Sequence, residues 1–373
     1  MPAHQFVTPL SSRTSPYAFP ATLPIRPRSK YTDLFMPELY PLLLIPSFDE
    51  RPWGVHDLRP IYTRIVKDPI GESWLTWGKN TIANGPLSGQ TLGDVAQQYR
   101  RELVGTVAPY EDRFPLLVKF LFTADKLSVQ VHPDDEGAHR VGELFGKTEC
   151  WYVLDAKPGA QVALGLKPGV SVEDLRHAIA SVQAEQLLNW MDVERGDMLY
   201  VAAGTVHTIG GGLVLLETQQ ASDVTYRLYD YGRPRELHID KGLAAIKLNS
   251  DAGKVVQDMK GKQRFLVRSP FFQVERMGLH SELTAEMTPD SAHIIVAVDG
   301  SGVLESPGME PVSFARGDAV VVPAACQDIA CARSGIWRSC ACHCRRATSR
   351  NPRLFWAQAV SAPNSRFRFL MQR

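Results

Sequence analysis

Residues 195–207 read Arg-Gly-Asp-Met-Leu-Tyr-Val-Ala-Ala-Gly-Thr-Val-His. Arg195-Gly196-Asp197 is typical of a tight turn, and the apolar residues that follow it are typical of a buried strand. The same order recurs at Arg316-Gly317-Asp318, before Ala-Val-Val-Val-Pro-Ala-Ala. This echo predicts two related β-barrels, with the second over residues 265–325.

Short apolar runs bounded by Gly, Pro and Asp surround this stretch. They occur at 114–122, 150–154, 198–201, 213–217, 293–298 and 319–322. Strands at such spacing predict a mainly β fold, a sandwich or barrel. Helical patterns are few: Thr91 is a candidate cap for a helix over 91–104, and Ser171 with Asp174 forms a capping box for a helix over 171–179.

The composition narrows the class of protein. The chain has 373 residues, enough for about two domains, with 44% hydrophobic and 22% charged residues. A net charge of +1 gives no reason to expect nucleic acid or a membrane as a partner, and no apolar run is long enough to span a bilayer. Most cysteines crowd between Cys326 and Cys344, unlike a secreted disulfide framework, which favours a cytoplasmic protein.

Both ends differ from the middle of the chain. Residues 1–35 are rich in Pro, Ser and Thr without hydrophobic periodicity, and we expect a disordered or mis-assigned extension. After residue 328 the chain contains no Asp, Glu or Lys but nine Arg. We expect residues 329–373 to be an aberrant, disordered tail.

Four separated side chains have strand-compatible spacings for one metal site. Gln130 and His132 are two residues apart and share a strand face, as do Lys147 and Glu149. His207 follows the Gly204 bend at the end of the opening stretch. A Gln oxygen, a carboxylate and two imidazoles suit zinc and leave room for water or substrate.

A family resemblance rests on several motifs together. These are Phe114-Pro-Leu-Leu-Val-Lys-Phe, Lys126-Leu-Ser-Val-Gln-Val-His-Pro-Asp-Asp135, Gly146-Lys-Thr-Glu-Cys-Trp-Tyr152 and Gly204-Thr-Val-His-Thr-Ile-Gly210, with Phe48-Asp-Glu-Arg-Pro-Trp-Gly54 and Ile70-Gly-Glu-Ser-Trp74. The chain resembles type I mannose-6-phosphate isomerases in their shorter bacterial form, over residues 40–323. Residues 196–207 resemble a cupin motif, with Ala202 where proline is usual.

The resemblance implies two cupin-type jelly-roll barrels, of which only the first carries metal. We therefore expect a catalytic domain over 36–248 and a second, metal-free domain over 249–328. It also implies one Zn²⁺ held by Gln130, His132, Glu149 and His207. Arg227, in Ser-Asp-x-Thr-x-Arg, is the implied catalytic arginine, and Lys147 the implied substrate-binding lysine.

The implied reaction interconverts mannose 6-phosphate and fructose 6-phosphate through a cis-enediol. A carboxylate is needed to move the proton between C2 and C1, and Asp223 and Glu217 are the leading candidates. The partner is thus a small phosphorylated sugar, and we expect a monomer or homodimer. Two alternatives stay open: another cupin metalloenzyme, such as an iron dioxygenase, or a catalytically inactive sugar-binding cupin.

Overall fold

Antiparallel β-sheets dominate the fold, which confirms the mainly β prediction. The computed structural model describes residues 36–256, 264–278, 283–284, 290–326, 329–333 and 353–359. The extension 1–35 and most of the tail lie outside these residues. No helix in the described ranges is long and apolar enough to cross a membrane.

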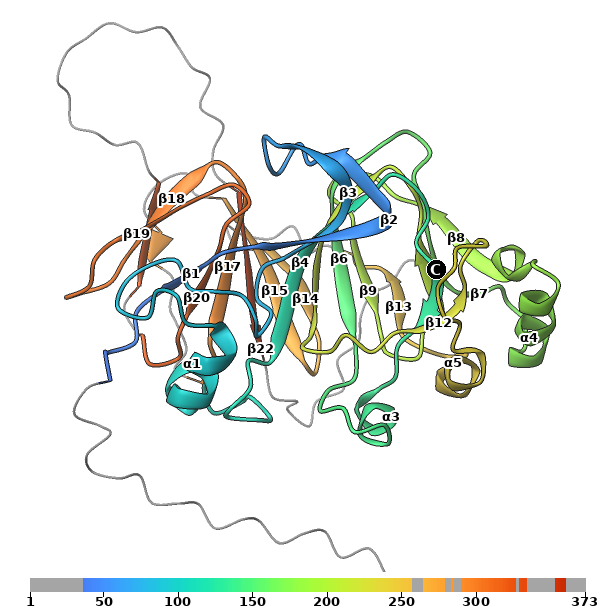
Figure 1. Cartoon of the computed structure of the whole chain (residues 1–373), viewed down its shortest axis with the longest axis horizontal. Helices are drawn as coiled ribbons and strands as arrows, with labels where there is room; N and C mark the ends of the chain where they lie inside the picture. The colour runs from blue at the N-terminus through green and yellow to red at the C-terminus, as the bar shows by residue number, and fades with distance from the viewer. Residues whose placement is uncertain are drawn as a thin grey trace, which may run out of the picture. The chain divides into compact units, whose positions relative to one another are not determined.

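Two sheets build the part of the molecule that holds the candidate site (Figure 1). The seven-stranded sheet has the order β13 (Ala252–Lys254), β9 (Met198–Val201), β6 (Glu149–Ala156), β11 (Leu213–Gln220), β4 (Leu116–Thr123), β3 (Ile65–Trp74) and β2 (Ser47–Asp57). The five-stranded sheet has the order β12 (Tyr226–Tyr229), β5 (Val129–Val131), β10 (His207–Ile209), β7 (Gln161–Leu166) and β8 (Leu188–Asp192).

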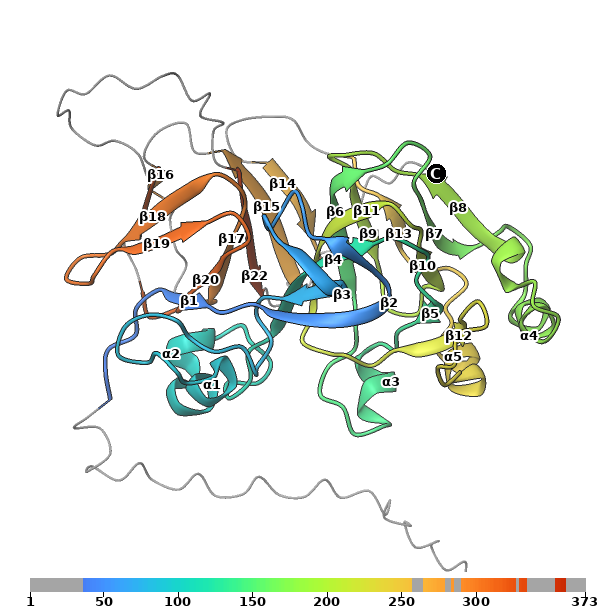
Figure 2. The ribbon, with the colours of Figure 1, turned by 45° about the horizontal axis from the view of Figure 1, so that its top comes forward.

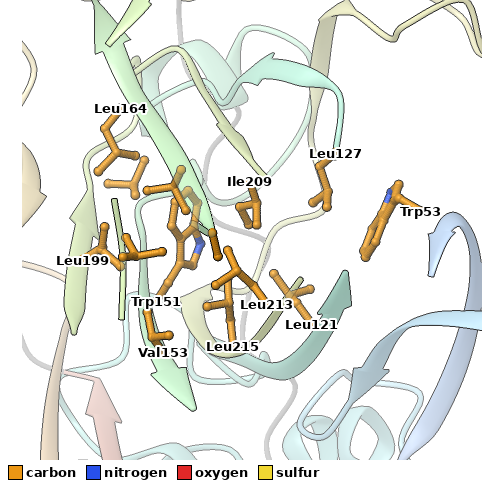
Figure 3. Packing of buried hydrophobic residues seen from close by; sticks show 14 residues of the cluster. Trp53, Leu121, Leu127, Trp151, Val153, Leu164, Leu199, Ile209, Leu213 and Leu215 are labelled. Atoms are coloured by element: carbon orange, nitrogen blue, oxygen red, sulfur yellow. The ribbon is translucent and has the colours of Figure 1, made fainter. Parts of the chain in front are cut away.

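A shared hydrophobic core joins these two sheets. Trp151 on β6 is fully buried among Val153, Leu199 and Leu215 of the larger sheet (Figure 3). Ile209 of β10 belongs to the same cluster from the smaller sheet.

The C-terminal half contributes most strands of two further sheets, drawn in orange and red in Figures 1 and 2, while the edge strand β1 is blue. The six-stranded sheet has the order β1 (Leu42–Leu44), β20 (Ala319–Val322), β17 (His293–Asp299), β22 (Arg353–Ala359), β15 (Phe272–Gly278) and β14 (Arg264–Arg268). The four-stranded sheet has the order β16 (Leu283–Thr284), β21 (Ala330–Arg333), β18 (Ser301–Glu305) and β19 (Val312–Ala315).

The helices are short. They are α1 (Leu92–Tyr99), α2 (Arg101–Val104), α3 (Asp135–His139), α4 (Val172–Ala180) and α5 (Ile239–Ala245), with a 3₁₀ turn at Ala184–Leu187. Thr91 and the Ser171–Asp174 capping box cap α1 and α4 as predicted. The single helix expected over 91–104 is interrupted at Arg100, whose φ of 53° lies in the left-handed region.

Two strands fall within the expected tail. β22 lies between β15 and β17 and pairs with both, and β21 pairs with β18. The composition of the tail did not indicate these strands, and the expected tail of 329–373 stays a prediction. The two-barrel arrangement and the boundary at 248/249 stay predictions.

Candidate active site

The three strongest candidate ligands converge. His132 directly follows β5, Glu149 begins β6, and His207 begins β10. One nitrogen from each imidazole and one carboxylate oxygen all lie within 4.8 Å of one another, and each side chain is about 1% exposed. The two sheets thus bring residues from three distant parts of the sequence into one buried cluster.

Both imidazoles are oriented for metal binding. The Nδ1–H of His132 donates to Val224 O (2.9 Å) and that of His207 donates to Thr205 O (2.9 Å), which leaves each Nε2 lone pair directed at the cluster. Burial lowers the pKa of both rings, that of His207 to about 4, so both are neutral at pH 7. Neutral imidazole is the ligand form.

Glu149 supplies the anionic oxygen of this cluster. Its Oε1 lies 3.4 Å from His207 Nε2, and its Oε2 lies 3.5 Å from His132 Nε2. Oε2 is buried, and the ammonium of Lys147 lies 3.1 Å from it. A buried carboxylate needs cationic or hydrogen-bonding partners, and a divalent cation at this point would be one.

Gln130 completes the set from the centre of β5. It pairs directly with His207 across the sheet, and its Nε2 lies 3.2 Å from His207 Nε2. Its Oε1 accepts from Ser128 Oγ (3.1 Å). Rotating the amide brings the oxygen toward the imidazoles, and a serine hydroxyl satisfies either orientation. Two nitrogens, a carboxylate and an amide oxygen fit zinc.

Lys147 adds a positive charge to the same point. Its Nζ lies 3.1 Å from His132 Nε2 and 3.1 Å from Glu149 Oε2. Glu217 Oε1 is 3.9 Å away. The lysine therefore adjoins both the cluster and Glu217, and its substrate-binding role stays a prediction.

A second group of buried charged side chains lies next to this cluster. Glu217 on β11 pairs across the sheet with Lys119 on β4, and Lys119 Nζ lies 3.3 Å from Glu217 Oε2 and 3.7 Å from Glu72 Oε1. Burial raises the pKa of Glu72, but Lys119 and Arg51 outweigh it and hold that pKa at about 2. Burial raises the pKa of Glu217 to about 8, against the opposing effect of Lys119.

A cavity of about 420 Å³ opens onto these groups. Of the residues singled out from sequence, it is lined by Gln130, Lys147, Glu149, Glu217, Asp223 and Arg227. His132 and His207 are not part of its lining, but both are buried against Glu149, which is. Asp223 is exposed, and Arg227 is the cross-strand partner of Gln130. The cavity is large enough for one small polar molecule.

Sequence reasoning assigned no role to five charged residues of the lining: Glu50, Arg51, Glu72, Lys119 and Arg235. A signal existed for Lys119, since it is the one charge in the otherwise apolar strand 116–123, where an unpaired lysine would be costly. Glu72 follows Ile-Gly at the buried end of β3 and carried a similar signal.

Comparisons with known proteins place the chain in a family. The family model described as phosphomannose isomerase type I, catalytic domain, matches residues 44–166. The mannose-6-phosphate isomerase ManA of Bacillus subtilis is 36% identical over 302 residues, 76% of this chain and 93% of that protein. The chain belongs to the mannose-6-phosphate isomerase family. This confirms the resemblance seen in the sequence.

Two further comparisons, one with a sequence and one with a crystal structure, support this family assignment. The mannose-6-phosphate isomerase of Streptococcus mutans is 35% identical over 298 residues, 76% of this chain and 92% of that protein. The crystal structure of the Bacillus subtilis mannose 6-phosphate isomerase matches with a TM-score of 0.73 at 32% identity, covering 85% of this chain and 99% of that one.

Proposed function

We propose that this isomerase interconverts mannose 6-phosphate and fructose 6-phosphate with one Zn²⁺ held by Gln130, His132, Glu149 and His207. The observation that most supports the proposal is the convergence of two neutral imidazoles on the buried carboxylate of Glu149, which lines a polar cavity. Zinc in such a site supplies positive charge that polarises a carbonyl and orients hydroxyl groups.

Arg227 stabilises negative charge in this proposal. The reaction moves a proton between C2 and C1 through a cis-enediol, so charge develops on the oxygens of those carbons. A guanidinium is permanently charged and offers a planar set of donors. Its support is that Arg227 lines the same cavity as Gln130 and is the cross-strand neighbour of that residue. Lys147 donates to the sugar hydroxyls from the other side.

Two carboxylates of the lining can carry the proton. Glu217 is buried between Lys119 and Lys147, whereas Asp223 is exposed at the cavity wall. A positioned carboxylate takes the proton from one carbon as base and returns it to the other as acid. We expect the variant of the true base to lose about 10²- to 10⁴-fold in kcat with little change in KM. Comparing Glu217→Gln with Asp223→Asn by steady-state kinetics and pH profiles identifies it.

The deciding experiment is a coupled isomerisation assay on purified protein before and after chelation. We expect activity to disappear with the chelator and to return with one equivalent of Zn²⁺. His132→Ala should abolish stoichiometric zinc, and Arg227→Ala should retain zinc while kcat falls by about 10²- to 10³-fold. His177→Ala, on the exposed face of α4, is the matched control. Full activity in both site variants, or stoichiometric iron with oxygen uptake, contradicts the proposal.

We also propose a cytoplasmic enzyme that acts as a monomer or homodimer. Cys150, Cys326 and Cys331 are free and buried, which agrees with a reducing compartment. Size-exclusion chromatography with light scattering measures the oligomeric state, and a trimer or larger assembly contradicts the expectation.

A further inference from the structure

A network of polar side chains adjoins the segments that carry the candidate metal ligands but does not line the cavity. Its centre is Gln220, the last residue of β11, which is 4% exposed. Thr148, between Lys147 and Glu149, is 2% exposed, and Asp135 is half-buried. The proposed reaction uses none of the three, yet a buried polar group is costly unless it is hydrogen-bonded. Their partners therefore indicate what they do.

The Gln220 amide joins the segment of Glu149 to the segment of His132. Its Oε1 accepts from Thr148 N (2.9 Å), and Thr148 directly precedes Glu149. Its Nε2 donates to Oδ1 of Asp135 (2.8 Å), three residues after His132. Because an N–H faces the amide oxygen and a carboxylate faces the amide nitrogen, only one orientation of this amide satisfies both partners. These two hydrogen bonds form a bridge, here called the Gln220 bridge.

The backbones of the two bridged segments are in direct contact. Gly146 N also donates to Asp135 Oδ1 (2.7 Å), and Lys147 N donates to Pro133 O (3.0 Å). A methyl group on Gly146 would lie 2.4 Å from Asp134 C, so only glycine permits this close approach. The Asp135 carboxylate thus accepts from Gly146 and from the bridge, and its position determines the spacing between the two segments.

The third ligand segment is attached through Thr148. Its Oγ1 accepts from Ala203 N (3.2 Å), and the next residue, Gly204, donates from its backbone N to His132 O (2.8 Å). Ala203 and Gly204 lead directly to His207, which begins β10. The bridge and these two bonds therefore connect the segments of all three converging ligands.

The turn that follows Gln220 also orients the His132 ring. Val224 O in this turn accepts from the Nδ1–H of His132 (2.9 Å). The turn is held by Gln219 Nε2, which donates to Ser222 O (2.5 Å), and by Val224 N, which donates to Ser222 Oγ (3.4 Å). One short segment thus determines both the location of the bridge and the direction of the His132 ring.

We propose that Gln220 is a positioning residue for the metal site: through Asp135 and Thr148 it holds the ligand-bearing segments at the spacing that zinc requires before zinc binds. This inference rests on the metal site of the proposed function and extends it beyond the four ligands. Ligands that are already in place lose little conformational entropy on binding, and partners that orient ligands typically contribute about 10- to 100-fold in affinity. The bridge therefore contributes to zinc affinity without touching zinc or substrate.

Changing one end of the bridge tests the inference. Gln220→Glu keeps an acceptor for Thr148 N but places a second carboxylate oxygen against Asp135 Oδ1. We expect the Kd for zinc, measured by competition with a chromogenic chelator, to rise about 10- to 100-fold. Gln161→Glu is the matched control, because Gln161 Nε2 donates to Asp192 Oδ1 at the same 2.8 Å but joins β7 to β8, which carry no candidate ligand. It should bind zinc as tightly as the wild type does, and a loss equal to that in Gln220→Glu contradicts the inference.

A second pair of variants covers the case in which Gln220→Glu does not fold. Asp135→Ala removes the acceptor for Gly146 N and for the bridge, whereas Asp135→Asn keeps an amide oxygen for both donors. We expect the zinc Kd to rise at least about tenfold in Asp135→Ala and to be largely restored in Asp135→Asn. A merely structural role would lower the stability of the metal-free protein in urea while the folded protein bound zinc with unchanged affinity. Unchanged affinity in Asp135→Ala, or an equal loss in Asp135→Asn, overturns the inference.

Hydrogen exchange separates this inference from the proposed function. If the wild type binds no zinc, the proposed metal site fails, and exchange of the metal-free proteins still tests the bridge. We expect the backbone amides of 147–149 to exchange at least about tenfold faster in Asp135→Ala than in the wild type, because the segment opens more readily. Asp135→Asn and Gln161→Glu should exchange at the wild-type rate. Exchange at the wild-type rate in Asp135→Ala as well means that the bridge does not hold the segment, and the inference is then wrong.

Discussion

Ser128 controls the orientation of the Gln130 amide. Its hydroxyl donates to Gln130 Oε1, and the amide nitrogen faces His207. Because a hydroxyl also accepts, Ser128 supports the rotated amide whose oxygen faces the metal site. We expect Ser128→Ala to weaken zinc binding about tenfold, at the lower end of the range for residues that orient ligands. Competition with a chromogenic chelator measures this. Ser88→Ala, an exposed hydroxyl outside the site, should bind zinc normally.

Glu72 links the buried charges to stability at acid pH. Its pKa falls from 4.5 to about 2 in the folded protein, so its contribution is full above pH 4.5 and is lost as pH falls toward 2. The contribution is at most roughly 3 kcal/mol. We expect the wild type to be more stable than Glu72→Gln at pH 6, and the gap to narrow as pH drops to 3. Urea unfolding of the metal-free proteins at several pH values measures the gap, and a constant gap contradicts the assignment.

At the residue scale, the sequence predicted which side chains share a strand face, because local alternation determines this. Two-residue spacing placed Gln130 with His132 and Lys147 with Glu149 on common strand faces, and the structure brings these side chains together. Alternation does not tell which strands face one another across the core. Arg51 and Arg235 belong to segments that only the tertiary fold brings to the same cavity, so no local pattern indicated that they line it together.

The N-terminus of α1 provides a test at the scale of one element. Thr91 Oγ1 accepts from Asp94 N (3.1 Å), which satisfies a helix N–H that would otherwise lack a partner. We expect Thr91→Ala to lower the free energy of unfolding by about 1 kcal/mol without changing kinetics, and Thr91→Ser to retain most of it. Chemical denaturation measures the loss. Ser88→Ala lies three residues earlier and outside the cap, so it should leave the free energy of unfolding nearly unchanged. A loss in Ser88→Ala equal to that in Thr91→Ala would contradict a stabilising role of the cap.

Elements were predictable where local signals agreed. β9 and β20 have the predicted bounds because a tight turn, a buried apolar run and a Gly or Pro after it mark each one. β22 was missed because its neighbours in sequence are basic and polar, while its partners β15 and β17 lie many residues away. Pairing with distant strands supplied the stability that the local composition did not indicate.

At the scale of the whole molecule, strands cross the expected domain boundary in both directions. β1 from the N-terminal side pairs with β20, and β13 from the C-terminal side pairs with β9. Such exchanges are invisible in sequence because hydrophobic patterns give a strand its faces but not its partner. They tie the half with the candidate metal site to the other half, so we expect the two to unfold together rather than in separate steps.

Alanine substitutions in the two Arg-Gly-Asp turns test how strongly the two halves are coupled. Gly196 has a φ of 101° and Gly317 a φ of 94°, so alanine costs about 1–2 kcal/mol of backbone strain at either position. A methyl group at residue 196 would meet no atom within 4 Å, whereas one at residue 317 would lie 2.4 Å from Tyr62 Cε1. Tyr62 cannot yield easily, because its hydroxyl donates to Gly317 O (3.0 Å) and lies 2.9 Å from Ser73 Oγ on β3.

We therefore expect Gly317→Ala to lower the free energy of unfolding by about 1–3 kcal/mol more than Gly196→Ala, the excess being the cost of overpacking between the halves. Urea unfolding of both variants, followed by fluorescence and by circular dichroism, measures the difference. Tyr62→Ala in the Gly317→Ala background should remove the excess, since the clash disappears with the ring. Equal losses in the two single variants would mean that Tyr62 does not hold the halves together.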